Sequence, residues 1–205
     1  TRLVKTAVET GVDKIVVASS AAVYGSPDSV PLSEDYDVSP ESPYALSKYW
    51  TESITLQQDS LHGLDSVALR YFNVYGSRQN PEGDYAAVIP KFASLMKEGK
   101  KPTVYGDGEQ TRDFIHIDDV VRANLLAAET SHVGEAYNVG TGSEVTIREL
   151  AEHIKEVSGS DSEIRHVDAR DGDIGRSQAD IERITSRLGF DPEVPLSAGL
   201  RSLFE

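Results

Sequence analysis

The sequence predicts an α/β protein with a parallel sheet. Residues 14–19 (KIVVAS) form a short β-branched run with the composition of a buried parallel strand, and residues 66–72 (SVALRYF) form a second strand-like run. A long segment with helical character separates these two runs. Further strand-like and helical segments then alternate to the end of the chain. This alternation is typical of the α/β class, in which crossover helices connect parallel strands.

The first part of the chain has clear helix boundaries. Apolar residues recur at helical spacing over residues 1–11, where Gly11 provides a C-terminal stop. Residues 26–42 are rich in proline, serine and acidic residues, and we expect them to form a loop. Ser42 then serves as a cap, and Pro43 takes the first position of a helix expected to run to about residue 59.

The rest of the chain continues the same alternation. We expect a polar loop over residues 73–84. Further along the chain, Thr146 and Glu149 form a capping box that marks the start of a helix. The predicted helices cover residues 88–97, 118–129, 147–157, 179–188 and 197–204, and the predicted strands or extended segments cover residues 103–105, 112–117, 136–139 and 164–167.

Composition limits the classes of function. The chain has 205 residues, enough for one sizeable core or two small lobes, and a formal net charge of −14 from 34 acidic and 20 basic residues. This charge disfavours nucleic acid as a partner, because phosphate binding requires the opposite sign. The lack of cysteine excludes disulfides and thiolate metal sites, and the five histidines show no metal-ligand grouping. No apolar run reaches membrane-spanning length and no signal peptide opens the sequence, so we expect a cytoplasmic protein without a membrane partner.

Residues 19–48 contain the most informative chemistry. Tyr44 and Lys48 are four residues apart, which places both side chains on one face of a helix. An ammonium beside a phenol favours the phenolate, and this makes the pair a candidate base. Ser20 ends an apolar run, where a strand would deliver its hydroxyl to the edge of a sheet. The alternative is a buried tyrosine, a strand-end serine and a surface lysine.

The combination of Ser19-Ser20-Ala21-Ala22-Val23-Tyr24-Gly25 with Tyr44-x-x-x-Lys48 resembles the extended short-chain dehydrogenase/reductase superfamily of sugar-nucleotide epimerases and dehydratases. The resemblance implies an NAD cofactor and three catalytic residues. Tyr44 would be the base, Ser20 would relay the proton and contact the substrate, and Lys48 would place its cation beside the nicotinamide ribose. Ser19, Tyr44 and Lys48 are the residues expected at the cofactor.

The resemblance also implies a fold. It is a partial doubly wound, Rossmann-like parallel sheet with a smaller C-terminal α/β substrate-binding lobe. Residues 1–74 would be the remainder of the NAD-binding domain and residues 75–205 mainly the UDP-sugar lobe, with residues 111–145 returning to the Rossmann core. The Gly-rich turn that would hold the pyrophosphate is not found, because Gly106-x-Gly108 has no third glycine and no strand-turn-helix context.

We therefore expect this chain to be a piece of a longer enzyme that lacks its N-terminal NAD-binding half. Alone it should be inactive and poorly stable or prone to aggregation, because missing strands leave sheet edges and apolar helix faces uncovered. The family resemblance implies a homodimer, in which helices near residues 1–10 and 44–59 pair across a two-fold axis.

The residues after Ser20 separate the reaction types of the family. Related 4,6-dehydratases have an Asp-Glu pair where this chain has Ala21 and Ala22, and a methyl group transfers no proton. This favours a UDP-sugar 4-epimerase that acts on UDP-glucose and UDP-galactose, or on their N-acetyl counterparts, through a transient 4-keto sugar. The alternatives are a UDP-glucuronate-type epimerase and a non-catalytic sugar-nucleotide binding fragment.

Several segments resemble the nucleotide-binding stretches of the family. In RYFNVYG, Asn73 would bind the diphosphate, and in AVIP, Ala87 and Val88 would meet the nucleotide. In TVYG, the ring of Tyr105 would lie against the uracil, since an aromatic face suits a nucleobase. A turn asparagine and a core tyrosine are the alternatives.

Two further segments supply charge. Arg112 in RDFIH and Arg170 in RDGD would clamp the diphosphate, because a guanidinium pairs with phosphate through two bonds, and Asp173 would bind the ribose hydroxyls. Both arginines could instead form surface ion pairs. Ser177 occupies the position of a gate beside the sugar, where a small side chain leaves room for a 2-acetamido group.

Overall fold

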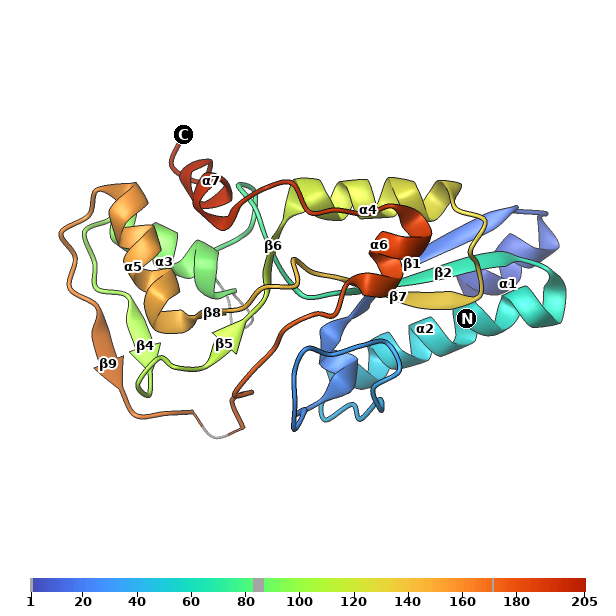
Figure 1. The fold of residues 1–205 in the computed structure, drawn as a ribbon, viewed down its shortest axis with the longest axis horizontal. Coiled ribbons are helices and arrows are strands. Elements are labelled where there is room, and N and C mark those ends of the chain that lie inside the picture. Colours follow the sequence, from blue (N-terminus) through green and yellow to red (C-terminus); the bar gives the residue numbers. More distant parts are fainter. Residues whose placement is uncertain (1, 83–86, 171) are drawn as a thin grey trace.

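The computed structural model describes residues 2–82, 87–170 and 172–205. At its centre a three-stranded parallel sheet has the order β1-β2-β7, formed by β1 (Lys14–Ser20), β2 (Asp65–Tyr71) and β7 (Glu135–Val139) (Figure 1). Ser20 pairs in register with Tyr71, and Tyr71 with Val139, so the carboxyl ends of the three strands lie side by side. The predicted α/β class and parallel sheet are confirmed.

Helices cover both faces of this sheet (Figure 1). α2 (Pro43–His62) packs on β1 and β2 from one face, and α4 (Ile117–Glu129) packs on the same strands from the other. α1 (Arg2–Glu9) lies against α2. The start of α2 is as predicted, with the Ser42 hydroxyl accepting a main-chain hydrogen bond of 3.1 Å. The helix ends at Gly63 in the left-handed conformation, about one turn later than predicted.

Three hydrophobic clusters support the fold of the described residues. The smallest contains Val23, Tyr24, Leu32, Phe72 and Ala179, and the two larger ones form the main cores. One lies between the sheet, α4 and α6 (Glu182–Leu188), and is centred on Leu69, Ile115 and Tyr137. The other is formed by α3 (Val88–Lys97), α5 (Ile147–Ser158), α7 (Leu196–Arg201) and β4 (Thr103–Tyr105). The second core lies in the region predicted as the substrate-binding lobe. Like α4, α6 packs against the sheet. The division at residue 74 and the return of residues 111–145 to the Rossmann core stay predictions.

Short strands connect the two cores. β3 (Asn73–Tyr75) pairs in parallel with β6 (Phe114–His116), β4 pairs in parallel with β9 (Arg165–Val167), and β5 (Thr111–Arg112) pairs in antiparallel with β8 (Val145–Thr146). Next to them, α5 begins with the predicted capping box: the Thr146 hydroxyl accepts the Glu149 N–H at 3.0 Å and the Thr146 N–H donates to the Glu149 carboxylate at 3.0 Å.

Several predicted elements differ from the structure. β1 is a half-buried strand with Ala18 exposed, because among the described strands it pairs only with β2, whereas β2 is buried along its length. The helix predicted from residue 179 begins at Glu182, because Ala179 forms an isolated parallel bridge with Leu32. Strands β3 and β8 were not predicted, and α7 ends at Arg201. Thr1 and residues 83–84 of the predicted loop lie outside the described residues.

Within the described ranges, no helix combines the length and the apolar character that crossing a membrane requires.

Candidate active site

Two adjoining cavities lie at the carboxyl end of the sheet. The inner cavity, of about 150 Å³, is lined by residues from β1, η1 (Ala21–Tyr24) and the segment before α6, and the outer cavity, of about 280 Å³, by residues from α3, β4 and β5. Asn73 and Arg112 line both cavities, so the two lie side by side. The predicted residues at the inner cavity are Ser20, Ala21, Ala22, Asn73, Arg112 and Ser177. Those at the outer cavity are Asn73, Val88, Tyr105, Arg112, Arg170 and Asp173.

Ser20 stands at the turn from β1 into η1. Its backbone is extended, and its hydroxyl accepts the Ala22 N–H at 3.2 Å as the cap of η1. This hydrogen bond keeps the oxygen at the end of the strand, where Ala21 and Ala22 present their methyl groups to the same cavity. The hydroxyl proton of Ser20 is not used by this bond and is available to a substrate oxygen.

Tyr44 and Lys48 lie together at the start of α2. The Lys48 ammonium donates to the Ala18 carbonyl at 3.1 Å and lies 5.7 Å from the centre of the Tyr44 ring. Tyr44 is 55% exposed, and neither side chain is among the described lining residues of the two cavities. The helical spacing therefore brings the two groups together as predicted, with the ammonium anchored to the strand that carries Ser20.

Ser19 does not join this group. Alternation along β1 directs Ser19 away from the face that presents Ser20. Ser19 is 1% exposed, and its hydroxyl donates to the Glu52 carboxylate at 2.6 Å. The strand commits the Ser19 side chain to a buried carboxylate, and the role of Ser19 at the cofactor stays a prediction.

Arg112 lies at the junction of the two cavities and is already paired. Its Nη1 donates to the Ile174 carbonyl at 2.6 Å, and its Nη2 lies 2.6 Å from the Asp173 carboxylate. Burial lowers the pKa of Arg112, while Asp173 acts in the opposite direction. Asp173, predicted at the ribose, is therefore also the counter-ion of the arginine predicted at the diphosphate.

Arg170 and Tyr105 also contact each other. The guanidinium carbon of Arg170 lies 3.6 Å from the centre of the Tyr105 ring, so one face of the ring is covered. The interaction with Arg170 lowers the pKa of the Tyr105 phenol. The prediction placed these side chains on different parts of the nucleotide. In this structure they form a cation–π pair, and a base that stacks on Tyr105 must use the free face or displace Arg170.

Asn73 and the start of α3 complete the outer cavity. The main-chain N–H of Asn73 and its side-chain amide both donate to the Asp113 carbonyl, at 3.0 and 3.1 Å, which leaves one amide hydrogen for a ligand. Val88 lines the cavity, whereas Ala87 caps α3 and does not appear among the described lining residues. Ser177, 8% exposed, lines the inner cavity as predicted.

Gln110 and Lys91 are two of the outer-cavity residues that the prediction missed. The Gln110 amide donates to the Tyr105 carbonyl at 3.0 Å and to Asp173 at 3.3 Å. Gln110 lies two residues before Arg112, so strand alternation would have placed the two on one face. Lys91 follows Val88 by three residues on α3, a spacing that places both on one side of a helix. With Arg112 and Arg170, Lys91 gives the outer cavity three cations in a chain of net charge −14.

The described residues fit only part of a dinucleotide site. Tyr44 is exposed and Lys48 is half-buried on α2 beside β1, where a nicotinamide ribose could meet them. The phosphates need a glycine-rich turn before a helix N-terminus. In the part of the chain that the structure describes, Gly106 and Gly108 lie in the turn between β4 and β5, two strands, which agrees with their rejection as a phosphate loop. The same residues hold no cluster of three or more His, Asp or Glu side chains suited to a metal ion.

Comparisons with known proteins identify the family of this chain. The model of the NAD dependent epimerase/dehydratase family matches residues 1–140. UDP-glucose 4-epimerase of Mycolicibacterium smegmatis is 38% identical over all of this chain, which covers 65% of that protein. dTDP-glucose 4,6-dehydratase of Streptomyces griseus is 36% identical over 97% of the chain, which covers 60% of that protein.

A solved structure gives the same result for the fold. UDP-N-acetylglucosamine 4-epimerase from Methanobrevibacter ruminantium, in complex with UDP-N-acetylmuramic acid, superposes with a TM-score of 0.95 at 40% identity. The alignment covers 99% of this chain and 65% of that one, so the chain spans less than two thirds of these relatives. The family match over residues 1–140 and these identities show that the chain belongs to the NAD-dependent epimerase/dehydratase family and shares its Rossmann-like fold.

Proposed function

We propose that the protein to which this chain belongs is an NAD-dependent UDP-sugar 4-epimerase. The observation that carries the proposal is the pair of neighbouring cavities: Ser20 lines the inner one, which shares Asn73 and Arg112 with a cationic outer one. A sugar in the inner cavity and a uridine diphosphate in the outer one would place the hexose at the Ser20 hydroxyl. Relatives named as UDP-sugar 4-epimerases support this assignment.

The C–H bond at C4 is not acidic, so inversion of this carbon needs a route other than removal of its proton. When bound, NAD supplies that route by accepting the C4 hydride and returning it to the opposite face. Tyr44 takes the C4 hydroxyl proton, directly or through Ser20, which leaves a ketone at C4. Lys48 is held beside the Tyr44 ring, 5.7 Å from its centre, by a 3.1 Å hydrogen bond to the Ala18 carbonyl. When the ketone is reduced again, Tyr44 returns the proton, so no atom is lost.

The lining of the inner cavity supports epimerisation over dehydration. Elimination of water from C5–C6 needs an acid and a base beside the sugar. Ala21 and Ala22 follow Ser20 in the wall of the cavity and offer methyl groups only. Because dehydratases occur among the relatives, this difference is the feature that separates the two reactions for this chain.

The choice of sugar is inferred from the small side chain of Ser177. Its small side chain lies in the wall of the inner cavity, where a larger residue would reduce a volume of about 150 Å³. We propose that the enzyme accepts N-acetylhexosamines, alone or together with glucose and galactose. The relative solved with UDP-N-acetylmuramic acid supports a site of this kind for an N-acetyl sugar. A UDP-glucuronate-type epimerase is the alternative within the same chemistry.

The test uses the intact parent protein with UDP-galactose, UDP-GalNAc and UDP-galacturonate, and identifies the products by chromatography. Interconversion of UDP-GalNAc with UDP-GlcNAc supports the proposal, whereas turnover of UDP-galacturonate alone favours the alternative. Tyr44→Phe removes the base and should abolish turnover while leaving UDP binding unchanged, since Tyr44 lines neither cavity among the described residues. Undiminished turnover by this variant would refute the mechanism. The proposed homodimer is tested by sedimentation of the same parent.

A sugar-nucleotide binding protein without catalysis is the second candidate. It is supported by the two cavities, whose described lining residues account for a UDP-sugar and include neither Tyr44 nor Lys48. Both candidates predict that UDP binds to the parent. Only the epimerase predicts that NAD binds as well, so calorimetry with NAD and with UDP separates them.

A further inference from the structure

A buried ion pair holds α2 against the sheet. Arg70 of β2 contacts the Glu52 carboxylate of α2 through Nη2 at 2.5 Å and through Nε at 3.1 and 3.2 Å. The two side chains are only 6% and 4% exposed. An arrangement with several directed bonds fixes the orientation of both side chains, as well as the distance between the helix and the strand.

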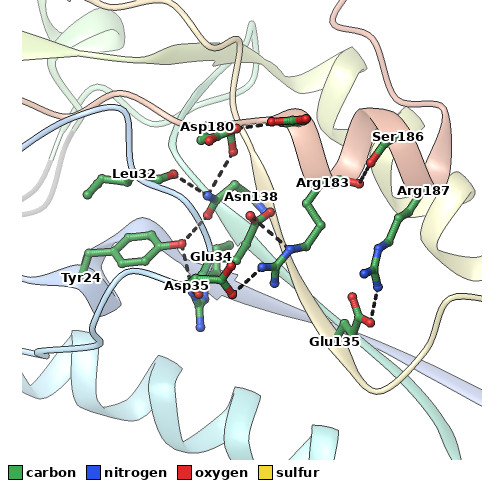
Figure 2. Close-up of polar contacts among 12 residues, drawn as sticks. Tyr24, Leu32, Glu34, Asp35, Glu135, Asn138, Asp180, Arg183, Ser186 and Arg187 are labelled. Carbon is green, nitrogen blue, oxygen red and sulfur yellow. Dashed lines mark hydrogen bonds and ion pairs between the residues drawn. The ribbon is translucent and has the colours of Figure 1, made fainter.

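The pair is the centre of a larger network. Ser19 of β1 donates to Glu52 at 2.6 Å, and Nη1 of Arg70 donates to the Tyr24 hydroxyl at 2.9 Å. Figure 2 shows the Tyr24 hydroxyl directed at Asn138 of β7, to which it donates at 2.7 Å. α2, η1 and all three strands of the sheet are therefore connected through one set of buried polar groups.

This network meets the catalytic residues at consecutive positions of β1. The Ala18 carbonyl accepts the Lys48 ammonium, Ser19 donates to Glu52, and Ser20 faces the inner cavity. On α2, Tyr44, Lys48 and Glu52 follow each other at intervals of four residues and so lie along one side of the helix. Any rotation of α2 about its axis would break two contacts at once, the one between Glu52 and Ser19 and the one between Lys48 and the Ala18 carbonyl.

We propose that Glu52 and Arg70 are positioning residues for the reaction. They set the rotation and the axial position of α2 against the end of β1, and thereby hold Tyr44 and Lys48 at the distance from Ser20 that proton transfer needs. This inference rests on the proposed function. Neither residue is among the described lining residues of either cavity, so both act through α2 and not on the substrate.

An apolar contact would not supply the same control. Apolar residues of similar volume can replace a buried ion pair without loss of stability, so the pair is poorly explained as a source of stability alone. Apolar packing is non-directional, and a helix held in that way can rotate or slide by fractions of a turn. Displacement of a reacting group by about 1 Å lowers rates by about 100-fold.

The test compares two variants of the intact parent with the wild type. In Glu52→Met/Arg70→Met the pair becomes apolar, and the protein is expected to remain folded. We expect kcat to fall about 10- to 100-fold, with KM for the UDP-sugar within twofold of the wild-type value. The control is Asp119→Asn, which alters another fully buried carboxylate, one that accepts the N–H groups of Glu193 and Val194 at 2.9 and 3.1 Å. It should lower the urea midpoint and leave kcat within twofold.

A kcat for the double variant within twofold of wild type would overturn the inference, as would an equal fall in the Asp119→Asn control. The crystal structure of the double variant gives a second readout. Loss of the Lys48–Ala18 hydrogen bond supports positioning, and its retention in unchanged geometry contradicts it. This readout needs no turnover. If the parent converted no UDP-sugar, the proposed function would be refuted, and the orientation of α2 in the crystal structure would still test the inference.

Discussion

Replacement of Asp113 by asparagine should destabilise the parent protein more than most single substitutions. The Asp113 side chain is fully buried, and its two oxygens accept four hydrogen bonds. Oδ1 accepts from the N–H and the hydroxyl of Thr141 at 2.8 and 2.7 Å, and Oδ2 accepts from the N–H groups of Gly142 and Ala179 at 3.0 and 3.2 Å. An asparagine keeps one acceptor oxygen and turns an NH₂ group toward the other two donors.

The size of the loss in stability follows from the number of hydrogen bonds that the substitution removes. Two hydrogen bonds to a charged acceptor are lost, at about 1.5 kcal/mol each, which gives about 3 kcal/mol. Burial raises the pKa of Asp113 despite its four donors, so removal of the charge offsets part of this loss and about 3 kcal/mol is the upper estimate. The carbonyl of the same residue holds Asn73, so we also expect weaker UDP binding.

The assay is urea unfolding of the intact parent, followed by circular dichroism. With an m-value of about 3 kcal/mol/M, the loss lowers the midpoint by up to about 1 M. Asp161→Asn, at an exposed carboxylate, is the matched control and should change the stability by less than about 0.5 kcal/mol. A midpoint for Asp113→Asn as close to wild type as that of the control would show that the four bonds are not formed in solution.

Three further predictions concern the site, the acid limit and the isolated chain. Arg112→Lys should weaken UDP binding to the parent by about 10-fold or more, because a lysine ammonium cannot keep both the Ile174 and the Asp173 contacts, and an unchanged Kd by calorimetry would refute this. The hydrogen bond from Arg176 lowers the pKa of Glu144 below its ordinary value of 4.5, so this carboxylate contributes stability above pH 4.5 that is lost as the pH falls through the lowered pKa. Glu144→Gln should therefore flatten the acid side of the curve of melting temperature against pH, and parallel curves would contradict the prediction. The 205-residue chain alone should self-associate in sedimentation experiments, since apolar side chains on α1, α2 and α4 are exposed, and a sharp, reversible, monomeric melt would contradict this. The exposed side chains are Leu3, Trp50, Leu61, Ile117, Val121 and Leu125.

The elements that the sequence predicted correctly are those with local signals. Cap residues placed the starts of α2 and α5 correctly, and α3 was predicted within its observed bounds. Strands β3 and β8 were missed because two or three residues carry no period, and their pairing depends on partners far along the chain. The exposure of β1 was missed for a related reason: burial depends on which strand lies beside it, and composition does not encode that.

The candidate site was likewise predicted in part. Family resemblance identified the residues that converge on the two cavities, including Ser20, Asn73 and Arg112. Spacing along β5 and α3 would have added Gln110 and Lys91. The pairing of Arg112 with Asp173, and the stacking of Arg170 on Tyr105, join residues more than 60 positions apart. Such pairs depend on the relative placement of whole segments and could not be predicted from local sequence.

The chain cannot gain or lose a residue at the end of β1 without disturbing the contacts described above. Residues 18, 19 and 20 send their groups to a lysine, to a buried glutamate and to the proposed sugar site, in that order. Inserting or deleting one residue there would shift every later side chain to the other face of the strand, so that Ser19 would turn away from Glu52 and Ser20 away from the inner cavity. We expect natural relatives to differ in the length of other connections long before they differ in the length of this one.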